Sequence, residues 1–336
     1  MNSFGRLFRV QIFGESHGVG VGIVVDGCPP GLPLTQADFL PDLERRKAGA
    51  KGTTPRKEDD LPIFRSGLFN DRATGAPITI FFENNNTRSG DYEKQRAIPR
   101  PGHADFVANH KYGGFEDYRG GGHFSARLTT GIVAAGVIAK RILESYSPDI
   151  HILADLSEVG GEVDPEKGLQ KAIDAKDTIG GIVECRVKGL PIGLGEPFFD
   201  SAESLLAHAI FAIPAVRGIE FGTGFAAARM FGSQHNDPIL DTTGHTATNH
   251  AGGIVGGITN GNELVFRLAI KPTSSTPKEQ TSLNWETGQV ESFSVKGRHD
   301  LCVALRAPVI VEAMTAIVLA DLLLLEGKAR VNFPVS

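Results

Sequence analysis

Histidines in short glycine-rich segments are the side chains of this chain best suited to chemistry. Three segments carry one each: GESHG at 14–18 (His17), RPGHAD at 100–105 (His103) and RGGGHFSAR at 119–127 (His123). Histidine changes its charge near neutral pH, and glycine lets the backbone approach a ligand closely. We therefore expect an acid–base site built from these loops.

The segment 14–18 also matches G-x-S-x-G, the nucleophile elbow of the α/β-hydrolases. That elbow requires a strand, a sharp turn and then a helix, whereas residues 20–26 (GVGIVVD) predict a second strand. A serine hydrolase that uses Ser16 is therefore a minor alternative. A polar hairpin turn without catalysis is another.

Glycines flanked by arginines before a predicted helix indicate an anion site. Arg119 and Arg127 flank the glycines at 120–122, and a helix is predicted from Ser125 to about residue 144. Backbone N–H groups and the helix dipole would face the anion. His103 lies at the predicted start of another helix, whose positive end lowers the pKa of a histidine and favours its neutral ring. The alternatives are a flexible glycine loop and a capped surface helix.

Later polar segments add cations and hydroxyls. They are NHAGGIVGG at 249–257, KPTSS at 271–275 and GRHD at 297–300. The lysine and hydroxyls of KPTSS suit a phosphate, although each segment alone could be an ordinary polar loop. The basic residues that follow the first predicted helix favour a carboxylate or phosphate clamp, or else a solvated helix end: Arg45, Arg46, Lys47 and Lys51. The histidines lack HExxH or His/Cys spacing, so no metal site is predicted.

Composition limits the classes of protein. The chain has 336 residues, 41% of them hydrophobic and 22% charged, and a formal net charge of −5. These values predict a globular protein that binds neither nucleic acid nor an anionic membrane. The three cysteines are far apart in sequence, which argues against disulfides and fits a reducing compartment. The apolar stretches 131–143 and 309–325 are too short or too interrupted by charges for a membrane span, and no signal peptide is expected.

Strand and helix patterns alternate without a βαβ rhythm, which favours an α+β fold. The expected strands are 7–13, 20–26, 76–82, 150–156, 181–189 and 263–271. The expected helices are 35–46 with a kink at Pro41, 125–144, 202–213 and 308–326. Residues 276–297 predict a polar hairpin or loop excursion, and no segment resembles a linker, so residues 1–336 are taken as one domain.

The motifs GESHG, RPGHAD, RGGG with SAR, NHAGG, KPTSS and GRHD occur in an order that closely resembles the chorismate synthase family, from Phe8 to about Leu324. The resemblance implies a lyase that converts 5-enolpyruvylshikimate 3-phosphate to chorismate, the last step of the shikimate pathway. It also implies a need for reduced FMN without net redox change. The implied fold is a single β-α-β sandwich with mostly antiparallel sheets, and the implied assembly is a cytoplasmic homotetramer.

The resemblance also assigns roles to residues. His17 is implied as the general acid at the leaving phosphate and His103 as the residue beside the flavin. Asp300, Ser16 and Ser125 are implied to help move the C6 proton. Flavin contacts are implied at His123, Phe124, Ser125, Ala126, Pro214, Ala215, Gly256, Lys271, Pro272, Thr273, Ser274, Ser275 and Arg298. With the clamp and the flanking arginines, the predicted anion-binding residues are Arg45, Arg46, Lys51, Arg119 and Arg127.

Two positions depart from the family pattern: His123 replaces an arginine, and Pro214 replaces a frequent asparagine. The first loses a fixed charge and the second a side-chain hydrogen bond. The chain shows no Rossmann or P-loop motif, so NADPH is expected to act only indirectly, through an external flavin reductase. A non-catalytic flavin or phosphoanion-binding module is the remaining alternative.

Overall fold

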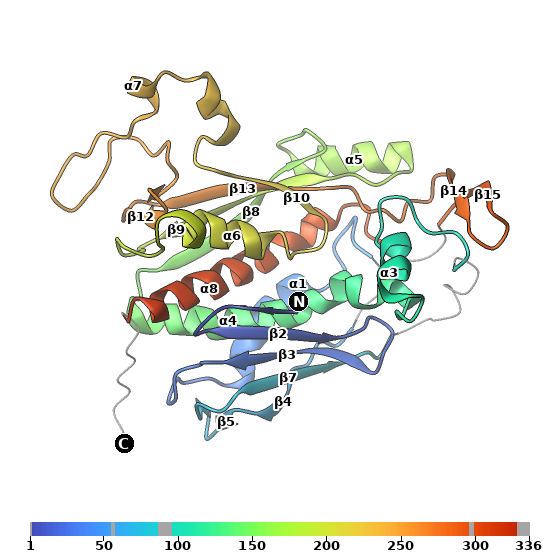
Figure 1. Ribbon diagram of the computed structural model, residues 1–336, viewed down its shortest axis with the longest axis horizontal. Helices are drawn as coiled ribbons and strands as arrows, with labels where there is room; N and C mark the ends of the chain where they lie inside the picture. Colours follow the sequence, from blue (N-terminus) through green and yellow to red (C-terminus); the bar gives the residue numbers. More distant parts are fainter. Residues whose placement is uncertain (1, 55–57, 87–95, 296–298, 328–336) are drawn as a thin grey trace.

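Two antiparallel sheets enclose a layer of helices in this computed structural model, which describes residues 2–54, 58–86, 96–295 and 299–327 (Figure 1). The first sheet has the order β1 (Ser3–Phe4), β2 (Arg9–Gly14), β3 (Gly20–Asp26), β7 (Ile78–Glu83) and β4 (Ile63–Ser66). The second has the order β10 (Val216–Phe221), β13 (Leu264–Ile270), β9 (Gly181–Lys188) and β8 (His151–Val159). The predicted α+β sandwich of antiparallel sheets is therefore confirmed.

Two long helices form the middle layer, α4 (Thr129–Tyr146) and α8 (Ala307–Leu325). Both are apolar on nearly every side, as expected of helices covered by a sheet on one face and a neighbouring helix on another. A small residue lets them approach closely, because a Cβ on Gly136 of α4 would lie 2.3 Å from the Cβ of Ala313 in α8. The core of the protein lies along this contact.

Helix α8 is long and apolar enough to cross a membrane over Pro308–Leu325, but 83% of that stretch is buried inside the protein. Its two acidic side chains have partners there. Glu312 accepts hydrogen bonds from Arg45 and Lys140, and Asp321 accepts the backbone N–H groups of residues 6–8. We therefore assign α8 to the core.

The shorter elements surround this frame. They are α1 (Leu40–Arg46), α3 (Asp105–Tyr112), α5 (Pro165–Ala175), α6 (Ala202–Ile210), α7 (Gly232–His235), and the strand pairs β5 (Leu68–Phe69) with β6 (Arg72–Ala73), β11 (Ile254–Val255) with β12 (Ile258–Thr259), and β14 (Gln280–Asn284) with β15 (Gln289–Phe293). The β14–β15 hairpin lies beside α3, and α7 lies in an arm that projects from the second sheet (Figure 1).

Local signals explain the boundaries of several helices. Thr35 and Asp38 form the predicted capping box, but the first turn is a 3-10 helix (Gln36–Phe39) and α1 begins only at Leu40. Pro41 then falls in the first turn of α1, where its missing N–H leaves no bond unmade. Ser201 caps α6, as predicted, by accepting from the N–H of Ser204.

Candidate functional site

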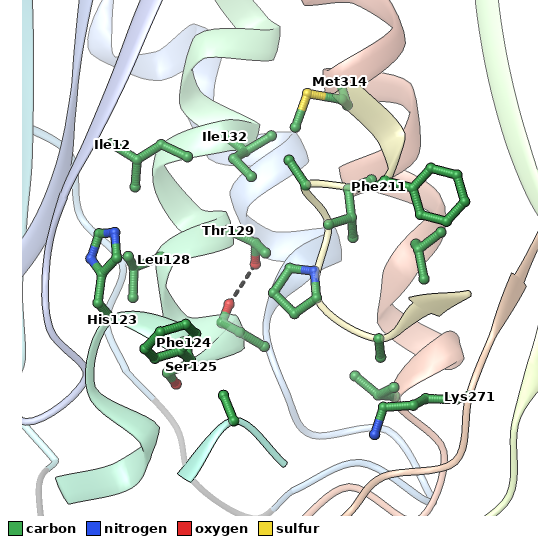
Figure 2. A pocket seen from close by; sticks show the side chains of 18 of the residues that line it. Ile12, His123, Phe124, Ser125, Leu128, Thr129, Ile132, Phe211, Lys271 and Met314 are labelled. Carbon is green, nitrogen blue, oxygen red and sulfur yellow. Dashed lines mark hydrogen bonds between the residues drawn. The ribbon is translucent and has the colours of Figure 1, made fainter. Parts of the chain in front are cut away.

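The large cavity of the molecule has a volume of about 580 Å³ and lies between the two sheets, against the start of α4. Figure 2 shows Ile132 and Met314 toward one end, with Ser125 and Lys271 toward the other. Apolar residues make up most of the inner walls, and the polar residues come mainly from loops and turns, with Thr129 from α4 and His208 from α6. A cavity of this kind suits a flat organic ligand with a polar tail.

A smaller cavity of about 170 Å³ adjoins it and is strongly cationic. Among the described residues, five cations face it against three carboxylates: Arg46, Lys47, Arg100, Arg127 and Arg306 against Glu58, Asp60 and Asp300. The two cavities share one wall, made by Arg100, Gly120, Ser125, Ala126, Thr273 and Asp300. Ligands bound in the two cavities would therefore contact the same residues from opposite sides.

The turn that carries Ser16 and His17 connects β2 to β3, which pair antiparallel with Gly14 opposite Val21. No helix follows Ser16, so the nucleophile elbow of a hydrolase is not formed, and the Ser16 side chain is fully buried. Ser16 instead lines the cationic cavity.

Two of the glycines at 120–122 lie against His17 and His103, the histidines predicted to be catalytic. A Cβ on Gly120 would lie 2.1 Å from Nδ1 of His17, and a Cβ on Gly121 would lie 3.2 Å from Cε1 of His103. Both residues have positive φ angles, +60° and +81°. The positions therefore require glycine for conformation and for space.

This arrangement differs from the predicted anion cradle. Ser125 accepts a hydrogen bond from the N–H of Arg127 and so caps a 3-10 turn, Ala126–Leu128. Helix α4 begins only at Thr129, so the glycines do not open it directly. Their observed role is to pack against His17 and His103.

The KPTSS loop closes the polar end of the large cavity. Nζ of Lys271 donates to the carbonyl oxygen of Gly102 at 2.8 Å and to Oγ of Ser274 at 2.6 Å. Burial and the charge of Arg217 lower the pKa of the Lys271 ammonium group. The hydroxyl of Thr273 is buried without a hydrogen-bond partner in the part of the chain that the structure describes. These groups fit the polar tail of a flavin mononucleotide, the cofactor that the resemblance implies.

Asp300 lies at the shared wall and is held from two sides. Its carboxylate accepts the N–H of Thr54 at 2.8 Å and faces the guanidinium of Arg306 at 3.3 Å. The remaining walls of the large cavity include the other residues predicted to contact the flavin, namely His123, Phe124, Pro214, Ala215, Pro272, Ser274 and Ser275. His123 itself makes contacts within the protein, with the carbonyl oxygen of Gly14 at 2.9 Å and the Asn2 side chain at 3.1 Å.

Two of the predicted anion-binding arginines form a buried cluster. Arg46 and Arg127 both donate to the carboxylate of Asp60, and all three side chains line the cationic cavity. Burial, with the nearby charge of Arg306, lowers the pKa of Arg46. Asp60 thus already neutralises part of the charge of Arg46 and Arg127, and its carboxylate fixes the distance between their two guanidinium groups.

Other predicted residues lie away from the cavities. Arg45 makes a bidentate ion pair with Glu312, at 2.7 Å on both sides, and Arg119 pairs with Asp117 at 2.8 Å. Lys51 is exposed, and Gly256 lies in the exposed turn between β11 and β12. None of these four lines either cavity. Arg298 lies outside the described residues.

Some site residues escaped the sequence analysis. Arg306 and Asp60 line the cationic cavity, and His208 and Phe211 line the large one. Asp60 stands in a run of charged residues that resembles a solvated loop, and His208 and Phe211 belong to α6 and the turn that follows it. Only the position of Arg306 in the sequence, shortly after GRHD and just before the last predicted helix, could have indicated that it belongs to the site. Within the described ranges, no three His, Cys, Asp or Glu residues are grouped to hold a metal ion.

Comparisons with known proteins agree with this geometry. Residues 8–324 match the family model described as chorismate synthase. The chain is 73% identical to the chorismate synthase of Chitinophaga pinensis, over 98% of both sequences. It is 45% identical to that of Dehalococcoides mccartyi strain BAV1, over 97% of both. It also resembles a structure described as "Crystal Structure of Chorismate Synthase", with a TM-score of 0.73 and 26% identity over 96% of this chain and 93% of the other.

Proposed function

This chain belongs to the chorismate synthase family, and from that membership we propose how its two adjoining cavities divide the reaction between them. The enzyme is a lyase that eliminates phosphate and a C6 proton from 5-enolpyruvylshikimate 3-phosphate to give chorismate, the last step of the shikimate pathway. The large cavity binds FMN, and the cationic cavity binds the substrate. The observation that carries this assignment is the wall that the two cavities share.

The cationic cavity matches the charges of the substrate. The substrate carries two carboxylates and a phosphate, and guanidinium groups bind such oxyanions through paired N–H groups. Arg46, Arg127 and Arg306 supply these groups from partly or fully buried positions, where electrostatic attraction is stronger than in bulk water. The same residues orient the substrate against the shared wall.

Loss of phosphate requires a proton or positive charge at the leaving oxygen. His17 does not itself line either cavity, but it packs against Gly120, a residue of the shared wall, and we assign it as the acid at this oxygen. Asp300 and the hydroxyls of Ser16 and Ser125 lie around the same wall and hold or relay the C6 proton. A carboxylate alone is a weak base toward such a carbon acid. Reduced FMN, when bound, supplies the electron density that this step needs.

The polar end of the large cavity holds the cofactor in this proposal. Lys271, Thr273 and Ser274 bind the flavin's polar tail, while the apolar walls exclude water from the ring. His103 lines the same cavity and holds a proton beside the ring.

Anaerobic turnover tests the assignment. Purified protein is mixed with reduced FMN and substrate, and the release of phosphate and chorismate is followed. We expect His17→Ala to lower turnover by roughly 10²–10⁴-fold, the usual contribution of a general acid. His151→Ala is the control, because His151 is an exposed residue of β8. An unchanged rate in the first variant would remove His17 from its role.

The proposal also covers how the flavin is reduced and how many subunits the protein contains. We expect a cytoplasmic homotetramer whose flavin is reduced by an external reductase, with NADPH acting only through that enzyme. Incubating the protein aerobically with NADPH and FMN, without a reductase, tests the second point. Chorismate formed under those conditions would mean that the chain reduces its own flavin.

A further inference from the structure

We propose that Asp105 is a positioning residue that fixes which nitrogen of His103 carries the ring proton and holds Arg100 at the shared wall. Asp105 is the first residue of α3 and lines neither cavity, so it acts only through these two neighbours. The inference uses the proposed function only in taking His103 as the acid–base group of the large cavity.

One carboxylate collects donors from both neighbours. Oδ2 of Asp105 accepts Nε of Arg100 at 2.7 Å and the backbone N–H of Arg100 at 3.1 Å. Oδ1 accepts the other guanidinium nitrogen of Arg100 at 2.8 Å and lies 2.5 Å from Nδ1 of His103. These four contacts to the Asp105 carboxylate all come from residues within the segment 100–105.

The distances decide the position of the proton. A carboxylate oxygen and an imidazole nitrogen approach to 2.5 Å only with a proton between them. Burial raises the pKa of Asp105, but the hydrogen bonds from Arg100 and His103 outweigh it and hold that pKa well below its usual value. The carboxylate is therefore ionised, and Nδ1 of His103 is the donor.

The position of Arg100 is consistent with Nδ1 of His103 as the donor to Asp105. Its guanidinium nitrogen lies 3.0 Å from Nδ1 of His103, which would be a contact between two donors. Both groups donate to the same oxygen, Oδ1 of Asp105, and two donors that share an acceptor lie about this far apart. The carboxylate thus offsets the charge of Arg100 beside the ring. With Nδ1 bound to Asp105, Nε2 is the ring nitrogen that remains for proton exchange, and it lies 3.2 Å from the same guanidinium nitrogen of Arg100.

Apart from Arg100 and Asp105, no charged group among the described residues makes a hydrogen bond or ion pair with His103. Arg96, Glu116 and Asp117 line the same pocket of about 50 Å³ as His103. Asp117 accepts from Arg119, and Oε1 of Glu116 accepts from Asn109, whereas Oε2 of Glu116 is buried without a hydrogen-bond partner among the described residues. Lys271 lines the large cavity together with His103, and its ammonium group donates to the carbonyl oxygen of Gly102.

Nuclear magnetic resonance of protein with ¹⁵N-labelled histidine tests the proton position without flavin or substrate. The His103 signals are identified by their loss in His103→Ala. We expect Nδ1 to be protonated at neutral pH in the wild type. In Asp105→Asn the signals should move to those of a ring that exchanges between tautomers, and Asp105→Glu should restore part of the wild-type pattern. Identical His103 shifts in wild type and Asp105→Asn would overturn the proposal.

Steady-state kinetics of the same variants provide a second test. Asp105→Asn should lower kcat by at least about 10-fold, less than the roughly 10²–10⁴-fold expected for losing an acid–base group, with a smaller change in KM. The double variant with His103→Ala should be slower than His103→Ala alone only by the part of the effect that passes through Arg100, and therefore by less than the full effect of Asp105→Asn. A double variant slower by the product of the two effects would refute the idea.

Glu166→Gln is the matched control, because Glu166 is also an acidic residue in the first turn of a helix, α5. It removes a charge from a helix N-terminus and should leave kcat unchanged. A folded protein without any chorismate synthesis would overturn the proposed function, whereas the resonance experiment would still test Asp105.

Discussion

At the scale of single residues, the site depends on contacts that leave no room for a side chain. Gly120 and Gly121 lie against His17 and His103, with φ angles open to glycine and costly for other residues. A histidine held on a fixed surface keeps its ring orientation through the reaction, which is what proton transfer requires. The glycine loop therefore sets the geometry of both catalytic histidines.

Gly120→Ala tests this role. The added Cβ would displace the His17 ring, so kcat should fall by roughly 10²-fold, the lower end of the effect of losing a general acid. Gly161→Ala is the control, because Gly161 also has a positive φ, +83°, but has nothing within 4 Å of the added Cβ. Both variants should lose similar stability in thermal unfolding, and only the first should lose activity. Equal activities would show that the contact with His17 does not matter.

At the scale of elements, helix α8 links the core to the charged residues around it. Glu312 is 2% exposed and accepts from Arg45, Lys140 and the backbone N–H of Ala154. It therefore ties α8 to α1, α4 and β8. The basic end of α1 thus serves two purposes, since Arg45 holds the frame while Arg46 faces the cationic cavity.

Glu312→Gln should destabilise the protein by about 1–3 kcal/mol at pH 7, because Arg45 and Lys140 lose a buried charged acceptor but keep Asp42 as a partner. Burial raises the pKa of Glu312, but Arg45 and Lys140 outweigh it and lower that pKa below its usual 4.5. A lowered pKa stabilises the fold above pH 4.5. The difference between wild type and variant should therefore shrink as the pH falls below that value.

Denaturant unfolding at several pH values measures this difference. Glu162→Gln is the control, since Glu162 pairs with Lys171 at the surface and contributes little. A difference between wild type and Glu312→Gln that stays constant down to pH 3 would contradict the assignment.

At the scale of the whole molecule, the large cavity is walled by both sheets and by both central helices. A ligand bound there contacts parts of the chain that are far apart in sequence. Binding to the native state alone raises the free energy of unfolding, by about 2.7 kcal/mol at a ligand concentration of 100 Kd. FMN should therefore raise Tm by several degrees.

Lys271 makes this prediction specific. FMN should stabilise the wild type more than riboflavin, which lacks the phosphate. Lys271→Ala should weaken FMN binding by about 10–100-fold, because hydrogen bonds to charged groups contribute roughly 1.5–3 kcal/mol. It should leave riboflavin binding nearly unchanged. Thermal shift measurements with both ligands distinguish these outcomes, and an equal loss for both would remove Lys271 from the phosphate site.

The sequence by itself predicted the positions of β2, β3, β7, β8, β9 and β13 and of helices α1, α4, α6 and α8, but not those of α5 and β10. Strand β3 (Gly20–Asp26) follows directly from its apolar run, and the cap at Ser201 from local hydrogen bonding. These are local effects, set by neighbours in the chain. The order of the motifs was likewise enough to indicate the family, and the comparisons confirm it.

The tertiary structure alone decided which residues meet. Arg45 and Arg46 are adjacent in sequence, yet one pairs with Glu312 in α8 and the other with Asp60. The 100° rotation per helical residue directs them to different partners, and those partners depend on packing between distant segments. The same holds for the wall shared by the cavities, where residues from 100 to 300 converge because two sheets close over two helices.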